Sequence, residues 1–343
     1  MKIHAQPLDL TLRHAFATSR SSSSVAHNVL VRIEGDGIEG FGEASPVRYY
    51  GQSQESCLKA LQQMDKVLRR HDALAIEAVL AELKARFPTE VSARAAVDLA
   101  LHDLLGKRVG LPLWKLFGLD PRKTPATSFT IGIDTLEKVV QKVGEAEEYP
   151  VLKIKVGVPG DVEIMREVRR LAPKKVLRVD ANCGWTVKEA IEKARALEKL
   201  GVEFIEQPIP PGNNAALKRI KTSIGLPLLT DESSLVPEDV PPLRGCVDGI
   251  NIKLVKCGGL REGLKMIHIA RACGLKIMLG CMIESSVLIS AAAQLSPLVD
   301  YADLDGNLLI TDDPFRGVRI NKQAKLLLPE GPGLGLTTAR AEC

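Results

Sequence analysis

From Ser128 onward, short apolar runs alternate with segments whose apolar positions recur at helical spacing. The strands that these runs predict are 129–133, 152–156, 176–182, 204–208, 227–233, 249–254, 276–281 and 301–306. Amphipathic helices are predicted between them, for example over 187–200 and 260–273. Strands joined in this way by helical crossovers favour an α/β fold of the (β/α)8 barrel type over an open sheet. The first strand is not followed by Gly-x-Gly-x-x-Gly, which disfavours a dinucleotide-binding fold.

The first third of the chain has a different pattern. The strands and helices that it predicts are 8–12, 28–34, 38–43, 54–87 and 93–106. A turn is expected at Gly35-Asp36-Gly37, and the serine-rich segment 18–27 reads as a polar loop that could serve as a linker or a lid. We therefore expect an α+β capping domain over residues 1–118, to which the tail 312–343 returns, and a catalytic barrel over 119–311.

Charged side chains stand at the ends of the predicted barrel strands. They are Lys155, Asp180, Glu206, Asp231, Lys253, Asp303 and Asp305. Up to Lys253 the successive members lie 25, 26, 25 and 22 residues apart, which is one strand, one helix and two short loops per step. Because the carboxyl ends of barrel strands meet on one face, we expect these side chains to share a single site.

Asp180, Glu206 and Asp231 form a set of three carboxylates, which repel one another unless a cation holds them. Oxygen ligands without His or Cys favour Mg²⁺, or Mn²⁺, over zinc. The alternative is that each carboxylate forms an ion pair with a neighbouring lysine or arginine. Three carboxylates at consecutive strand ends favour the metal site, whose ligands we expect Asn182 and Glu232 to orient.

Four lysines accompany these carboxylates. Lys153 and Lys155 lie two positions apart on one strand, so both point into the barrel. A second lysine and a divalent cation disfavour the ammonium form, which makes a neutral amine available as a base. We expect Lys155 and Lys253 to exchange a proton with the substrate from opposite faces. Lys153 is expected to form an ion pair or orient the substrate, and Lys256 to have a solvent or loop role.

Together these segments resemble the muconate-lactonizing subgroup of the enolase superfamily, over essentially the whole chain. The resemblance rests on LKIKVG, VDANCGW, IEQP, TDES and NIKLVKCGG, and on ARAAVDLALHDLLGK followed by GLPLWKLFG. It implies a modified barrel with a capping domain and an isomerase that depends on Mg²⁺. Lysine bases working beside Mg²⁺ on an ene-diolate are an already described feature of such sites.

Within the subgroup, YADLDG resembles the Asp-x-Asp with which dipeptide epimerases hold the free α-ammonium of their substrate, a role that falls to Asp303 and Asp305. Helix capping or solvation is the alternative for this pair. GCMIESS is also epimerase-like and adds Met282 and Glu284 to the expected substrate-binding residues. The resemblance implies that Mg²⁺ chelates the C-terminal carboxylate, which acidifies the α-hydrogen and stabilises the ene-diolate formed on proton loss.

The specificity loops of this family correspond to 18–27 and 47–52. They supply Arg20, His27, Arg48, Tyr49 and Tyr50, and no acid. We expect Arg20 and Tyr50 to contact the substrate. A basic rim suits an acidic side chain, such as the glutamate of Ala-Glu from cell-wall peptide recycling, and a small or hydrophobic dipeptide is the alternative.

Three other functions stay open. The same scaffold could act as an N-acylamino acid racemase, an o-succinylbenzoate synthase-like enzyme or a cycloisomerase, whose substrates lack a free ammonium. A Schiff-base aldolase using Lys155 would leave the three carboxylates unexplained. A barrel kept as a binding or structural protein would need neither Lys155 nor Lys253.

Composition narrows the partners. The formal net charge is +4 over 343 residues, and no Lys/Arg cluster is interleaved with aromatics, so we expect no nucleic-acid partner. The apolar stretches are too short to span a bilayer and MKIHAQPLDL has no apolar signal segment, so we expect no membrane association and a cytoplasmic protein. Seven cysteines without CxxC spacing favour a reducing compartment, with Cys183 and Cys281 as semi-buried thiols. A homo-oligomer is compatible with the sequence but not established by it.

Overall fold

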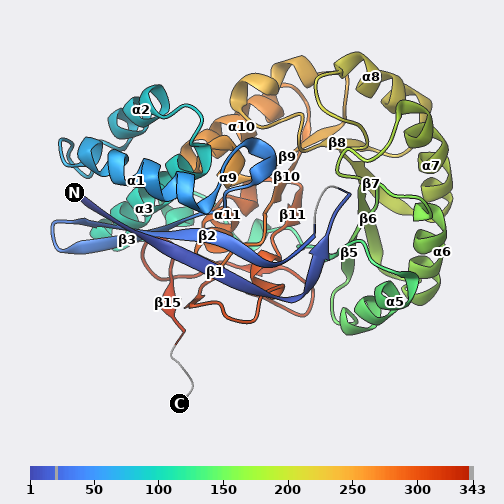
Figure 1. The fold of residues 1–343 in the computed structure, drawn as a ribbon, viewed down its shortest axis with the longest axis horizontal. Helices are drawn as coiled ribbons and strands as arrows, with labels where there is room; N and C mark the ends of the chain where they lie inside the picture. The colour runs from blue at the N-terminus through green and yellow to red at the C-terminus, as the bar shows by residue number, and fades with distance from the viewer. Residues whose placement is uncertain (20–21, 340–343) are drawn as a thin grey trace.

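The fold is a closed barrel of parallel strands with an antiparallel sheet beside it, as a computed structural model shows (Figure 1). The structure describes residues 1–19 and 22–339. Adjacent barrel strands pair in parallel, in the order β11-β10-β9-β8-β7-β6-β5-β4. They are β4 (Phe129–Ile131), β5 (Val151–Lys155), β6 (Val176–Asp180), β7 (Val202–Glu206), β8 (Leu228–Thr230), β9 (Gly249–Ile252), β10 (Lys276–Gly280) and β11 (Tyr301–Asp303). A parallel bridge between Thr127 and Ala302 closes the ring.

Each strand predicted for the barrel is present, so the expected (β/α)8-type fold is confirmed. The helices around the barrel are α5 (Leu136–Glu145), α6 (Asp161–Leu171), α7 (Val187–Lys199), α8 (Asn214–Ser223), α9 (Leu254–Cys257), α10 (Leu260–Ala272) and α11 (Ser286–Gln294). Between β8 and β9 the chain forms the 3-10 turns η3 (Pro237–Asp239) and η4 (Pro241–Leu243) in place of a long helix. Further 3-10 turns are η1 (Arg48–Tyr50), η2 (Pro121–Lys123), η5 (Ser296–Leu298) and η6 (Gly306–Leu308).

The antiparallel sheet belongs to the N-terminal part of the chain. It consists of β1 (Lys2–Ala17), β2 (Ser22–Gly35) and β3 (Ile38–Ala44), and it is followed by α1 (Gln54–Leu68), α2 (Ile76–Arg86), α3 (Val91–Val109) and α4 (Leu113–Leu116). Alternate residues Val29, Val31 and Ile33 of β2 are fully buried in one core with side chains of α1 and α3. The predicted turn is present, with Asp36 and Gly37 at φ values of 52° and 76°, as a tight hairpin requires.

Within the serine-rich segment 18–27, residues 22–27 are strand, so the expectation of a loop over its whole length is wrong. Strand β2 begins at Ser22, and His27 pairs with Asp9 of β1, its Nδ1 lying 2.8 Å from Asp9 Oδ1. Pairing with β1 extends these two strands as far as the barrel (Figure 1), where Ala17 O accepts a 2.9 Å hydrogen bond from Ile133 N. Arg20 lies outside the described residues.

The tail after β11 contacts both parts of the molecule. It contains β12 (Phe315–Arg316), β13 (Arg319–Ile320), β14 (Leu326–Leu327) and β15 (Thr337–Thr338). Its buried side chains Phe315, Leu326 and Leu334 belong to the core of the barrel. Its backbone also contacts the N-terminal part, because Leu334 N donates to Asp103 Oδ1 at 2.8 Å. Within residues 1–19 and 22–339, no helix has the length and apolarity to cross a membrane.

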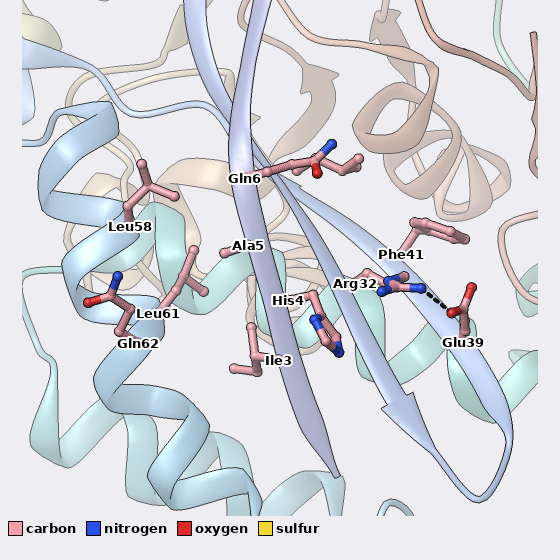
Figure 2. A pocket seen from close by; sticks show the side chains of 11 residues that line it. Ile3, His4, Ala5, Gln6, Arg32, Glu39, Phe41, Leu58, Leu61 and Gln62 are labelled. Carbon is pink, nitrogen blue, oxygen red and sulfur yellow. Dashed lines mark hydrogen bonds and ion pairs between the residues drawn. The ribbon is translucent and has the colours of Figure 1, made fainter.

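A surface concavity of about 640 Å³ lies on the antiparallel sheet beside α1 (Figure 2). Arg32 and Glu39 form an ion pair along its wall, and Phe41 lies next to them. None of the charged residues predicted at the barrel strand ends lines this concavity. The candidate active site therefore has to be sought at the barrel mouth.

One buried carboxylate joins the antiparallel sheet to the barrel. Glu43 of β3 is fully buried, and its Oε2 accepts hydrogen bonds from Ser285 Oγ at 2.5 Å and Ser285 N at 3.2 Å, where Ser285 is the N-cap residue of α11. Burial raises the pKa of Glu43 to about 7, against the hydrogen bonds from Ser285 and Asn28 that favour its charged form.

This pKa predicts a pH dependence of stability. Between the ordinary value of 4.5 and about 7 the folded protein keeps a proton on Glu43 that the unfolded chain has lost, so stability falls as the pH rises through this window. Glu43→Gln cannot lose that proton. We expect the unfolding free energy of this variant, measured by urea denaturation from pH 4.5 to 7.5, to rise relative to that of the wild type as the pH increases. The difference should grow by up to about 3 kcal/mol over this pH range. The exposed Glu34→Gln is the control, and a pH-independent difference for Glu43→Gln would contradict the prediction.

Candidate active site

The charged residues predicted at the strand ends lie together at the barrel mouth. The parallel register places Lys155 beside Asp180 and Asp180 beside Glu206 on β5, β6 and β7. Asp231 and Lys253 immediately follow β8 and β9. All of these side chains are buried, none with more than 9% of its surface exposed. The site is thus a buried cluster of alternating positive and negative charges.

Lys153 is the centre of this cluster. Its Nζ lies 2.6 Å from Glu206 Oε2, 2.6 Å from Asp303 Oδ2 and 3.3 Å from Asp180 Oδ2. Desolvation lowers the pKa of this fully buried lysine, but the charges of Asp303 and Glu206 outweigh it and raise the pKa well above its ordinary value. Lys153 is therefore an ammonium ion that three carboxylates share.

Two further lysines contact the carboxylates from either side. Lys155 Nζ lies 2.7 Å from Asp180 Oδ2, and Lys253 Nζ lies 3.2 Å from Asp231 Oδ2. Burial alone would raise the pKa of Asp180, but the charges of Lys155 and Lys153 hold it well below its usual range. The ion pairs that the alternative to a metal site requires are therefore present.

Lys256 takes part in the same cluster, so the expected solvent or loop role is wrong. Its side chain is only 3% exposed, and its Nζ forms an ion pair with Asp231 Oδ1. The ammonium group also lies 5.8 Å from the centroid of the Tyr50 ring, which belongs to η1. The short helix α9 begins directly after Lys253 and returns the next lysine to the same carboxylate. The sequence signal for this role was the spacing of the two lysines in KLVK, because residues three positions apart lie on the same side of a helical turn.

Asn182 and Gln207 hold the loops that follow β6 and β7. Asn182 N donates to Asp180 Oδ1 at 2.9 Å, and its Nδ2 lies 3.3 Å from Glu232 Oε1. Gln207, which the sequence analysis missed, accepts a 2.9 Å hydrogen bond from Asp231 N. Both residues have positive φ values, 43° for Asn182 and 35° for Gln207. Such values are uncommon for residues other than glycine, and residues with them are often found at functional sites. The signal for Gln207 was its place directly after Glu206.

The Asp303–Asp305 pair, at the end of β11, lies across the barrel mouth from the loop that follows β7. Asp303 Oδ1 accepts a 2.5 Å hydrogen bond from Ser128 Oγ, and Asp305 Oδ2 accepts one of 2.6 Å from Thr130 N. Burial, followed by the charge of Asp303, raises the pKa of Asp305 to about 6. Cys281 Sγ lies 3.1 Å from Asp303 O, beside the pair. The two carboxyls thus face the barrel interior in different electrostatic settings.

The loop after β10 forms the wall next to Lys253. Met282 Sδ lies 3.9 Å from Lys253 Nζ, and Met282 N donates to Glu284 Oε1 at 2.9 Å. Glu284 is fully buried, and burial raises its pKa well above the usual range. On the opposite side, Ser19 Oγ of the long hairpin donates to Asn182 O at 2.9 Å. Loops of the N-terminal part and of the barrel therefore enclose the cluster together.

The donor set is suited to a hard divalent cation. Asp180, Glu206 and Asp231 offer only oxygen ligands from three consecutive strands, and the buried Oδ1 of Asn182 has no hydrogen-bond partner within the described residues. Burial, followed by the charge of Asp180, raises the pKa of Glu206 to about 7 although the ammonium group of Lys153 lowers it. Within residues 1–19 and 22–339, no three Asp, Glu, His or Cys side chains lie close enough together to bind one metal ion. The ammonium group of Lys153 lies between the carboxylates of Asp180 and Glu206.

Comparison with known proteins identifies the family. Residues 135–342 match the family described as enolase C-terminal domain-like, and residues 3–118 match the mandelate racemase / muconate lactonizing enzyme N-terminal domain. The chain is 41% identical, over 98% of its length and 88% of the relative, to an L-Ala-D/L-Glu epimerase of Bacteroides thetaiotaomicron.

Solved structures agree with these matches. A dipeptide epimerase from Cytophaga hutchinsonii, complexed with Mg and D-Ala-L-Val, superposes with a TM-score of 0.94 at 29% identity, over 99% of this chain and 96% of that one. A dipeptide epimerase from Methylococcus capsulatus, complexed with Mg and L-Arg-D-Lys, gives 0.90 at 34% identity, over 98% and 99%. The resemblance found in the sequence is confirmed, and the chain belongs to the enolase superfamily, in its mandelate racemase and muconate lactonizing enzyme group.

Proposed function

We propose that this protein is a Mg²⁺-dependent isomerase that epimerises a dipeptide at the α-carbon of its C-terminal residue. The observation that carries the proposal is the position of Lys155 and Lys253. Strands β5 and β9 are four places apart in the eight-stranded ring in either direction, so the two lysines face each other across the barrel mouth. Epimerisation needs this arrangement, because a proton must leave from one face of the carbon and return to the other.

Asp180, Glu206 and Asp231 would hold the metal, with Asn182 and Glu232 orienting them. A bound divalent cation supplies charge that stabilises the ene-diolate formed when the α-proton leaves. Burial lowers the pKa of Lys253, but the charge of Asp231 outweighs it and raises the pKa above its ordinary value. If Asp231 also bound a cation, its negative charge would raise the pKa of Lys253 less. The neutral amine of Lys253 would then be accessible as a base.

The two lysines carry the proton in our proposal. One Nζ takes the α-proton and becomes an ammonium group, and the opposite ammonium group gives a proton to the other face of the carbon. The configuration inverts, and each lysine ends in the protonation state that the reverse reaction needs. Burial at the barrel mouth keeps bulk water away from the carbanionic intermediate.

Asp303 and Asp305 are the proposed anchor of the substrate's α-ammonium, next to Lys153. Support comes from their buried carboxyl oxygens at the end of β11, on the same side of the barrel as β4 and β5. Met282, Glu284 and Tyr50 would complete the pocket around the dipeptide. The role proposed for Arg20 concerns a residue outside the described ranges.

We propose an acidic dipeptide, such as L-Ala-D/L-Glu, as the substrate. Segment 47–52 carries Arg48 and no acid, so this rim of the barrel mouth is basic. The Bacteroides relative named for L-Ala-D/L-Glu supports the same choice. The corresponding physiological role would be the metabolism of cell-wall peptides.

We further propose that residues 1–118 with the tail 312–343 act as a cap on a catalytic barrel of residues 119–311. The hydrogen bonds of the tail to Asp103 and Thr11 support this division. A reducing cytoplasmic location is also proposed, supported by six free cysteines among the described residues.

Deuterium uptake tests the proposed function. With Mg²⁺ in D₂O, mass spectrometry should find one deuterium at the α-carbon of the C-terminal residue of free-amine dipeptides, and none when EDTA replaces Mg²⁺. Ala-Glu should exchange faster than Ala-Lys, since segment 47–52 carries Arg48 and no acid. Absence of exchange with every free-amine dipeptide would overturn the proposal and leave N-acylated amino acids as the next substrates.

The aspartate pair gives a second test. Asp305→Asn removes the proposed ammonium anchor without breaking an ion pair to Lys153, and should lower kcat/KM for dipeptides about 100-fold, the cost of one lost charge pair. Turnover of an N-acylated amino acid should change little, since it has no ammonium. Asp300→Asn is the control, because Asp300 precedes β11 at the end of the strand away from the site and pairs with Arg271 and Lys276. An equal loss for both substrate classes would contradict the assigned role.

A further inference from the structure

Two buried polar residues of the antiparallel sheet face the barrel rather than the core of their own sheet. Asn28 on β2 and Glu43 on β3 expose 1% and 0% of their surface. Asn28 Nδ2 donates to Glu43 Oε1 at 2.7 Å, which joins the neighbouring strands through their side chains. A buried polar pair of this kind costs stability unless its remaining donors and acceptors also form hydrogen bonds. The other hydrogen-bond partners of Asn28 and Glu43 therefore indicate what the pair does.

Those partners all lie in the loop that connects β10 to α11. Asn28 Nδ2 donates to Ile283 O at 3.0 Å, and Glu43 accepts from Ser285 N and Ser285 Oγ. Ser45 Oγ, two residues after Glu43, also lies 3.5 Å from Ile283 O. The sheet thus binds the loop through the carbonyl of Ile283 and the amide of Ser285. Glu43 and Ser285 are 242 residues apart in the sequence.

The loop held in this way is the wall beside Lys253. Met282, whose Sδ lies 3.9 Å from Lys253 Nζ, directly precedes Ile283. Glu284, between the two residues that the sheet holds, folds back onto Met282 N at 2.9 Å. A displacement at Ile283 or Ser285 therefore moves the groups that limit where the amine of Lys253 can point. No comparable contact joins Asn28 or Glu43 to Lys155 among the described residues.

We propose that Asn28 and Glu43 are positioning residues, which fix the β10–α11 loop against Lys253 and so align one of the two bases from outside the barrel. The proposal rests on the proposed function, because only a reaction that uses two opposed lysines makes a one-sided effect visible. The sheet, and not only the loops at its edge, then contributes to the active site.

Asp103 provides a matched control from the same part of the molecule. It is also a fully buried carboxylate of the N-terminal part, and it accepts hydrogen bonds from Phe41 N at 2.8 Å and Leu334 N at 2.8 Å. These contacts join β3 to the tail and do not reach residues 281–285. Loss of Asp103 should therefore destabilise the protein without favouring one lysine over the other.

The experiment compares Glu43→Leu, Glu43→Gln and Asp103→Leu in two measurements. Amide hydrogen exchange of a peptide covering 281–291, followed by mass spectrometry, reports how firmly the loop is held. Cα–H exchange in D₂O, started separately from each epimer of one dipeptide, reports each lysine, because an epimer can exchange through the single lysine that faces its α-proton.

Glu43→Leu should speed amide exchange in the loop about tenfold, the effect of a lost buried hydrogen bond. It should slow Cα–H exchange of one epimer about tenfold and leave the other within about twofold, as expected for a misplacement at one base only. Glu43→Gln should behave like the wild type, since its amide can accept from Asn28 and donate to Ser285 Oγ. Asp103→Leu should affect both epimers equally.

Unchanged amide exchange in Glu43→Leu, or an equal effect of this variant on both epimers, would overturn the proposal. If Glu43→Leu does not fold, Asn28→Ser removes the amide donor and should give the same one-sided loss. A wild-type enzyme that exchanges no dipeptide would overturn the proposed function and the role at Lys253 with it. The amide exchange of the loop would then still decide whether the sheet holds it.

Discussion

Charge balance in a buried cluster is the constraint on which the rest of this structure depends. Carboxylates and ammonium groups are costly to remove from water unless they compensate one another. At the barrel mouth, Lys153 contacts three carboxylates while Lys155 and Lys253 each contact one from opposite sides. The same groups that stabilise the cluster by pairing are those that can bind a cation and exchange a proton. Structural and chemical roles therefore fall on one set of side chains.

The N-terminal part of the chain matters because it encloses this cluster. The long β1–β2 hairpin contacts Asn182 through Ser19, and Tyr50 of η1 lies over Lys256. Glu43 contacts the barrel at Ser285 through a buried hydrogen bond. Low access of water strengthens the electrostatic interactions within the site, so the enclosing contacts affect the chemistry as well as stability.

Much of the barrel and its charged residues could be predicted from the sequence, because strand period and strand-end position are local signals. The spacing of Asp180, Glu206 and Asp231 sufficed to bring them to one face. Lys256 was misjudged because a short helix turns it back to Asp231, which no period reveals. Glu43 was missed because its partner Ser285 is 242 residues away. Segment 18–27 was taken for a loop because serine content masks strand pairing that β1 imposes.

The most direct test of the central claim, two bases on opposite faces of one carbon, compares Lys155→Met with Lys253→Met. Each variant should lose epimerisation roughly 10²–10⁴-fold and retain Cα–H exchange in D₂O with one epimer only, the opposite epimer in each case. Lys188→Met, whose side chain is 83% exposed, should match the wild type. Retention of the same epimer by both variants, or undiminished epimerisation in either, would contradict the account.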